Sequence, residues 1–178
     1  MTHMMTLLSL GSGLLSSTAL ATVITVPASV THPADQNPQP SVNECDHTES
    51  ALRCVKFHGN YDGDTVTVSI PDVHPLLGRK ISVRLYGIDT PEMYSSDTCE
   101  RDAALKAQRL VRELMTGSGQ IDLENVQRDK YFRILADIRV DSGSVSGILL
   151  AKGLAYPYFG GTKKRINWCT GRPYGAED

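Results

Sequence analysis

The stretch "YDGDTVTV" (61–68) contains Asp64, the residue whose placement most strongly indicates chemistry. Strand alternation gives Asp64 the same parity as Val66 and Val68, so its carboxylate is predicted to point toward the core. A carboxylate in that position is costly unless something positive compensates it. We therefore expect a compensating positive group close to Asp64.

A second set of oxygen atoms lies in "RLYGIDTPE" (84–92), where Asp89 is followed by Thr90 and Pro91. Because a proline disfavours the helical conformation for the residue before it, the Thr90 carbonyl can be held in one direction. The two aspartates and this carbonyl would supply hard oxygen ligands, which suit Ca²⁺ or Mg²⁺ better than zinc. A divalent cation bound there would compensate the charge of Asp64.

Two arginines and a glutamate accompany these oxygen atoms. Arg84 and Glu92 flank Asp89 in the same run. Arg133 lies in "RDKYFRILADI" (128–138), on the parity opposite to the apolar residues of its predicted strand. This combination predicts a site that attacks a phosphodiester, in which Glu92 takes a proton from water and both guanidinium groups brace the transition state.

Each of these motifs alone also has an ordinary structural explanation. "TPE" is a common helix start, "DGD" is usually a turn and "DKYFR" is usually a solvated strand edge. Their combination is more specific. It resembles the staphylococcal nuclease (thermonuclease) family, whose sequences carry a "DGDT" strand start, an "R-L-x-x-I-D-T-P-E" run and a later "D-K-Y-x-R" segment.

The resemblance covers about residues 53–157 and implies an OB-fold barrel that cleaves DNA and RNA with the help of calcium. It implies one Ca²⁺ per site, with Mg²⁺ as a weaker substitute. Carried over by position, the resemblance implies calcium ligation by Asp64, Asp89 and the Thr90 carbonyl, catalysis by Arg84, Glu92 and Arg133, and nucleotide contacts from Lys130 and Tyr131.

The elements that must position these residues are short. Alternating apolar residues predict strands at 52–58, 65–70, 79–88, 119–126 and 131–140. Five short strands with interspersed helices fit a small closed Greek-key barrel better than a parallel sheet. We therefore expect an α+β fold that is mainly β, and the resemblance makes it a five-stranded OB-fold barrel with two or three helices.

A long helix is predicted over 99–115, because its apolar residues recur on one stripe. Asp97 and Glu100 form the expected capping pair at its start, and Gly117 is the expected stop. The stretch "SVSGILLAKG" (144–153) predicts a shorter helix. These helices would cover the barrel.

The N-terminal region is predicted to carry a targeting signal and to lie outside the folded domain. Residues 1–21 contain no Asp, Glu, Lys or Arg and end in Ala-Leu-Ala, which is typical of a secretory signal peptide. A buried helix or a transmembrane anchor is the alternative, but the glycines, serines and short apolar run favour the signal peptide. Residues 22–44, rich in Pro, Asn, Gln and Ser, predict a flexible linker. The nuclease-like domain is expected over 45–173, with a tail at 174–178.

Four cysteines fit an exported protein with two disulfides. Three connectivities are possible, and the closeness of Cys45 to Cys54 favours pairing these two, which leaves Cys99 with Cys169. Within the resemblance, these cysteines match exported Gram-negative and plasmid-borne members better than the cysteine-free staphylococcal type. We expect a periplasmic or secreted monomer whose mature form has no membrane attachment.

Overall charge does not identify a partner. A net charge of −2 provides no global field that would attract nucleic acid. The rival hypothesis is a non-catalytic OB-fold module that binds single strands or a protein. Such a module would not need two aspartates, two arginines and a glutamate together, so their joint presence favours catalysis. The preference between DNA and RNA, between single and double strands, and between endo and exo action stays open.

Overall fold

The computed structural model of this chain describes residues 44–129 and 131–174. The predicted signal peptide (1–21), nearly all of the predicted linker (22–44) and most of the predicted tail (174–178) lie outside the described residues. Among the described residues, no helix combines the length and the apolar character that crossing a membrane requires.

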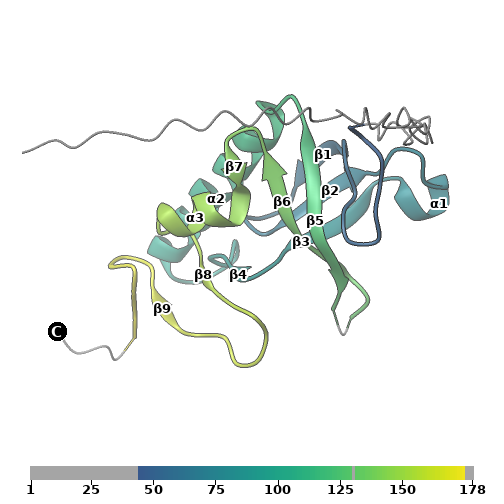
Figure 1. Ribbon diagram of the computed structural model, residues 1–178. Helices are drawn as coiled ribbons and strands as arrows, with labels where there is room; N and C mark the ends of the chain where they lie inside the picture. The colour runs from purple at the N-terminus through teal and green to yellow at the C-terminus, as the bar shows by residue number, and fades with distance from the viewer. Residues whose placement is uncertain (1–43, 130, 175–178) are drawn as a thin grey trace, which may run out of the picture. The chain divides into compact units, whose positions relative to one another are not determined.

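A mixed sheet forms the framework of the domain (Figure 1). Its strands are β1 (Lys56–Asn60), β2 (Thr65–Ser69), β3 (Ile81–Leu85), β5 (Ile121–Arg128), β6 (Ile134–Val140) and the two-residue β7 (Gly143–Ser144). The order across the sheet is β1-β2-β3-β6-β5, with β7 beside β6. Only β3 and β6 run parallel among these described neighbours, and the other pairs are antiparallel.

The chain just before β1 closes this sheet into a barrel. Leu52 and Leu123 of β5 exchange two backbone hydrogen bonds, with N–O distances of 2.9 and 2.8 Å. The Val55 amide donates to the Ile121 carbonyl at 2.9 Å. Because β5 is thereby joined to the segment that leads into β1, the two ends of the sheet meet. The predicted α+β, mainly β OB-fold class is confirmed.

Left-handed backbone positions alter three of the predicted strands. Cys54, with φ of 53°, lies before β1, which begins later than predicted. Gly87, with φ of 78°, separates β3 from β4 (Ile88–Asp89), where a single strand is predicted. Phe132, with φ of 63°, belongs to the turn before β6 and is 79% exposed. Apolar alternation does not report backbone handedness, so the sequence pattern alone could not place these breaks.

Within the described ranges, three helices accompany the barrel: α1 (Pro75–Gly78), α2 (Thr98–Thr116) and α3 (Val145–Ala151). The predicted long helix and the predicted shorter helix are both confirmed, whereas α1 lies in a connection for which no helix is predicted. α2 packs against β1 and α3, and α3 packs against β6. The most buried residues of α2 share one stripe, which comprises Ala103, Ala104, Ala107, Val111 and Met115.

The start of α2 is fixed by Asp97, as predicted. One carboxylate oxygen of Asp97 accepts hydrogen bonds from the amides of Cys99 and Glu100, at 2.8 and 3.4 Å. The reciprocal half of the predicted capping pair does not form. The Glu100 carboxylate instead accepts a hydrogen bond from the amide of Glu92, at 3.3 Å. The first turn of α2 is therefore tied to the loop that carries Glu92.

The C-terminal part of the domain adds three two-residue strands. β8 (Tyr156–Pro157) pairs with β4, whereas β9 (Ile166–Asn167) and β10 (Arg172–Pro173) pair only with each other among the described strands. β8 therefore brings the C-terminal segment against the end of β4, next to Asp89.

Two disulfides tie the chain, in the connectivity that the cysteine spacing favours. Cys45 is bonded to Cys54 across a sequence separation of 9, and Cys99 is bonded to Cys169 across a separation of 70. The first bond lies beside the seam where the barrel closes. The second joins the start of α2 to the C-terminal segment.

Gly63, the glycine of the "DGD" turn, leaves no room for a side chain. A Cβ added there would lie 2.7 Å from the Cβ of Ala107 and 3.0 Å from the Cγ2 of Thr90. Gly63→Ala is therefore expected to lower the free energy of unfolding by about 1–3 kcal/mol, as overpacking does. Gly59→Ala is the matched control, because a Cβ at Gly59 has no atom within 4 Å. Urea unfolding of both variants checks this, and equal stabilities would contradict the packing argument.

Candidate active site

Asp64 occupies the buried position that strand alternation predicts. It is 3% exposed, while Val66 and Val68 on the same parity are fully buried. A carboxylate oxygen of Asp62 accepts hydrogen bonds from the amides of Asp64 and Thr65, at 3.0 and 2.7 Å, and so fixes the turn that leads into β2. The turn thus fixes the backbone position of Asp64, whose carboxylate is buried.

Arg84 is the positive partner that Asp64 requires. One terminal nitrogen of its guanidinium lies 2.5 Å from Asp64 Oδ1, and the other lies 2.6 Å from Asp89 Oδ1. The antiparallel pairing of β2 with β3 sets Thr65 opposite Arg84, which explains this reach. The Arg84 side chain is only 14% exposed, so one guanidinium fork compensates two buried carboxylates.

Burial and charge act in opposite directions on this pair. Burial raises the pKa of Asp64, and the charge of Arg84 offsets only part of that rise. Burial lowers the pKa of Arg84, but the two carboxylates more than offset this effect and raise it. The guanidinium therefore keeps its charge, as an arginine with two anionic neighbours should.

Asp89 is bound by three side chains from three parts of the chain. Its Oδ1 faces Arg84, while its Oδ2 accepts a hydrogen bond from the Tyr156 hydroxyl at 2.8 Å and forms an ion pair with Lys163 Nζ at 3.1 Å. β8 presents Tyr156 directly opposite Asp89. Burial, together with the bond to Asp89, raises the pKa of Tyr156, so its hydroxyl stays a donor.

Thr90 also contacts Asp64, in a way that the sequence does not predict. Its amide and its hydroxyl both donate to Asp64 Oδ2, at 3.2 and 3.1 Å. Thr90 is 5% exposed. The residue predicted to offer a carbonyl therefore also holds the carboxylate of the other aspartate in place.

Glu92 lies at the mouth of this cluster and is accessible to water. Its side chain is 66% exposed, and its Oε1 lies 2.8 Å from Lys163 Nζ. The same lysine contacts Asp89, so Lys163 links the exposed glutamate to the buried aspartate. Glu92 thus stands next to the charged cluster while open to solvent, as a proton acceptor for water requires.

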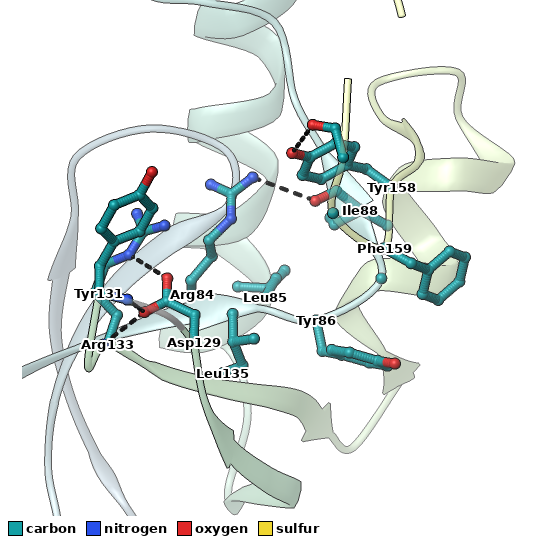
Figure 2. Close-up of a pocket in the computed structure, with 13 residues that line it drawn as sticks. Arg84, Leu85, Tyr86, Ile88, Asp129, Tyr131, Arg133, Leu135, Tyr158 and Phe159 are labelled. Carbon is teal, nitrogen blue, oxygen red and sulfur yellow. Dashed lines mark hydrogen bonds and ion pairs between the residues drawn. The ribbon is translucent and has the colours of Figure 1, made fainter. Parts of the chain in front are cut away.

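A cavity of about 300 Å³ opens beside Arg84 (Figure 2), and we call it the arginine cavity. Arg133, Tyr131 and Tyr158 line it together with Arg84. Figure 2 shows the Arg84 guanidinium between the Tyr131–Arg133 pair and the Tyr158 side. The two predicted catalytic arginines therefore line one cavity, although Arg84 lies in β3 and Arg133 lies just before β6.

Asp129 holds Arg133 in this cavity. Asp129 Oδ2 accepts a hydrogen bond from Arg133 Nε at 2.8 Å, and its Oδ1 accepts from the amides of Tyr131 and Arg133, at 2.8 and 2.9 Å. Partial desolvation raises the pKa of Asp129, but these hydrogen bonds outweigh it and lower the pKa. The Arg133 guanidinium also lies 5.6 Å from the ring centre of Tyr131.

The predicted residues thus divide into three groups. Asp64, Arg84, Asp89, Thr90 and Glu92 meet in one cluster, which Lys163 connects. Arg133 and Tyr131 join Arg84 in the arginine cavity, while Lys130 lies outside the described residues. The contacts of Asp129, Tyr156 and Lys163 are not predicted from the sequence. Of these, only Asp129 lies inside one of the motifs on which the resemblance rests.

The cluster has donors suited to a hard divalent cation. Asp64 and Asp89 are both 3% exposed, and in this structure each carboxylate is bound by a cationic side chain. Carboxylate and carbonyl oxygens are ligands that Ca²⁺ and Mg²⁺ prefer. Among the described residues, the other close group of potential ligands is Asp97, Cys99 and Cys169, whose cysteines are joined in a disulfide and offer no thiolate.

The fold and the cluster together define a class of protein: a small OB-fold barrel with carboxylates and arginines gathered at one barrel end, as phosphate chemistry requires. Residues 82–167 match the sequence model of the family described as "Staphylococcal nuclease homologue". Over these residues the barrel domain is similar to the staphylococcal nuclease family. The matched residues include Arg84, Asp89, Thr90, Glu92 and Arg133, whereas Asp64 precedes them.

Two curated relatives agree with this assignment. Endonuclease YncB of Bacillus subtilis (strain 168) is 38% identical over 108 residues, which cover 57% of this chain and 48% of YncB. The SPbeta prophage-derived endonuclease YokF of the same organism is also 38% identical over 108 residues, which cover 57% of this chain and 34% of YokF. The match thus spans about half the length of one relative and about a third of the other.

Proposed function

We propose that this protein is an exported, calcium-dependent nuclease that hydrolyses phosphodiester bonds of DNA and RNA. The observation that carries the proposal is the Arg84 fork, which joins two buried aspartates next to an exposed glutamate and lines a cavity with a second arginine. The names of the two relatives, both endonucleases, support the same class of reaction.

Glu92 is the proposed general base. Its exposed carboxylate accepts a proton from a water molecule while the water oxygen attacks phosphorus. The phosphorus–oxygen bond to the leaving group then breaks, and the leaving oxygen takes up a proton from solvent water. Arg84 and Arg133 donate hydrogen bonds to the phosphoryl oxygens, whose negative charge grows in the transition state.

The calcium ion belongs at the buried aspartates. Asp64, Asp89 and the Thr90 carbonyl would hold it, with Mg²⁺ as a weaker substitute. When bound, such an ion supplies positive charge that neutralises the phosphate and polarises its oxygens. Tyr131 and Lys130 are the proposed nucleotide contacts, and the position of Tyr131 in the arginine cavity supports its part of this proposal.

The rival proposal of a non-catalytic OB-fold binding module explains fewer of the observations. A binding module does not require two buried carboxylates compensated by one arginine, because that arrangement costs desolvation without adding contact area. It also does not require an exposed glutamate beside the cluster. Catalysis accounts for all of these features.

Cleavage of a circular substrate tests the proposal. Purified protein with Ca²⁺ is expected to cut supercoiled plasmid, circular single-stranded DNA and RNA, since an endonuclease needs no free end. Excess chelator is expected to abolish the cutting, and added Ca²⁺ is expected to restore it, because the ligands are hard oxygens. Gel electrophoresis of the products measures each outcome. Full activity in excess chelator would contradict calcium dependence, and intact substrates under all conditions would favour the binding module.

Export is also part of the proposal. The uncharged leader that ends in Ala-Leu-Ala and the two disulfides support a periplasmic or secreted protein. We propose that the mature form is a monomer without membrane attachment. Fractionation of cells that express the full chain, followed by N-terminal sequencing of the mature product, checks the location and the cleavage site together.

A further inference from the structure

The C-terminal segment 160–174, which we call the strap, lies outside the barrel sheet. Figure 1 shows it as the yellow segment beyond β8. Its only strands among the described residues, β9 and β10, pair with each other. Residues 160–165 are all exposed, and the described backbone hydrogen bonds of residues 166–174 stay within the strap. In the part of the chain that the structure describes, the strap therefore has no backbone pairing with the barrel.

One lysine of the strap nevertheless reaches the centre of the active-site cluster. Lys163 Nζ lies 2.8 Å from Glu92 Oε1 and 3.1 Å from Asp89 Oδ2. Within the described part of the chain, Lys163 is the side chain that hydrogen-bonds the Glu92 carboxylate. Because Glu92 is 66% exposed, this bond restricts a side chain that solvent would otherwise leave free to rotate.

The strap is anchored next to this contact by a covalent bond. Cys169 is bonded to Cys99, the second residue of α2, and the ring of Trp168 lies 6.3 Å from that of Tyr156. The α2 start is in turn tied to the Glu92 loop through Glu100. The disulfide thus holds the strap at the same end of the domain as the carboxylates that Lys163 contacts.

We propose that Lys163 is a positioning residue for Glu92, and that the Cys99–Cys169 disulfide holds the strap in place so that Lys163 reaches it. This inference rests on the proposed nuclease function. Lys163 fixes the glutamate carboxylate against Asp89, and these three residues line a second cavity of about 280 Å³. Loss of this contact leaves the base in many rotamers, so fewer enzyme molecules carry it in the reactive geometry.

The first test is the substitution Lys163→Ala. We expect kcat on plasmid DNA to fall about 10-fold while KM changes by less than about twofold, because the base is misplaced and substrate binding is not. Lys163→Arg should restore most of the rate, since a guanidinium can bond both carboxylates. Lys106→Ala is the charge control, because Lys106 is exposed on α2 away from the cluster. Unchanged or increased kcat in Lys163→Ala would overturn the proposal.

The second test couples the lysine to the disulfide. The double variant Cys99→Ser/Cys169→Ser is expected to lower kcat as far as Lys163→Ala does. Combining all three substitutions should lower it no further, because both changes remove the same contact. Cys45→Ser/Cys54→Ser is the control, since that disulfide lies at the barrel seam. Circular dichroism at the assay temperature confirms that each variant is folded.

The outcomes separate the proposals. If the fold-loss of kcat in the combined variant equals the product of the fold-losses from Lys163→Ala and from Cys99→Ser/Cys169→Ser, the lysine and the disulfide act independently. That result would overturn the coupling. If Cys99→Ser/Cys169→Ser does not fold, Lys163→Ala with its arginine rescue decides the positioning role alone. A wild-type protein that cleaves nothing would remove the nuclease function itself, whereas an active wild type with an equally active Lys163→Ala variant removes only this inference.

Discussion

Replacing Glu92 with glutamine is expected to lower the turnover number on DNA about 10²–10⁴-fold. Glutamine keeps the size and the hydrogen-bonding oxygen of Glu92 but cannot take a proton from water. Since the Glu92 side chain is 66% exposed, we expect the free energy of unfolding to change little. Steady-state rates at saturating substrate, with Ca²⁺ present, measure the effect.

An exposed glutamate away from the site provides the control. Glu113 lies on the solvent side of α2, so Glu113→Gln removes the same charge without touching the cluster. That variant should keep the wild-type rate. A Glu92→Gln variant with near wild-type turnover would remove Glu92 from the mechanism, whatever the control does.

Removal of Arg84 should have the largest effect on stability. Arg84→Met leaves Asp64 and Asp89 buried without their shared cation, and breaking a buried charge pair in this way costs about 3–5 kcal/mol. Urea unfolding without Ca²⁺ measures the loss. Because an ion that binds the folded state stabilises it, added Ca²⁺ should recover part of the lost stability without recovering the activity.

The control for this variant is an exposed ion pair. Arg139 contacts Glu124 with side chains that are 53% and 36% exposed, so Arg139→Met should cost about 1 kcal/mol or less. The stability loss of Arg84→Lys should lie between the losses of Arg84→Met and Arg139→Met, because a single ammonium cannot bond both aspartates as the guanidinium does. Equal stabilities of Arg84→Met and Arg139→Met would contradict the assigned compensating role.

Much of the site could be predicted because strand parity and short motifs are local properties. Parity alone placed Asp64 among buried valines and so required a positive partner. The motif that contains Arg84, Asp89 and Glu92 spans nine residues, so any fold that keeps it must bring these residues near each other. The barrel class followed from the lengths and alternation of the strands.

The unpredicted features depend on contacts between distant segments or on backbone handedness. The sequence motifs suggested a cation as the partner of Asp64, whereas the protein's own Arg84 fills that role in this structure. Lys163 lies in a polar stretch with no periodicity. Its contacts with Asp89 and Glu92 depend on the pairing of β8 with β4 and on the disulfide, which the local sequence does not specify. Phe132, which lies inside the predicted strand 131–140, instead adopts a left-handed conformation before β6, because alternation does not report φ.

The parallel pairing of β3 with β6 has a consequence for how the proposed active site assembles during folding. Val83 faces Ile134 across this pair, and these residues are joined through the whole of α2 and β5. Arg84 and Arg133 therefore come together only when this non-local pairing forms, a kind of contact that slows folding. A nascent chain that has not yet delivered β6 holds the aspartate motifs but cannot place Arg133 beside Arg84. Activity should thus appear late and all at once, and fragments that end before β6 should be inactive.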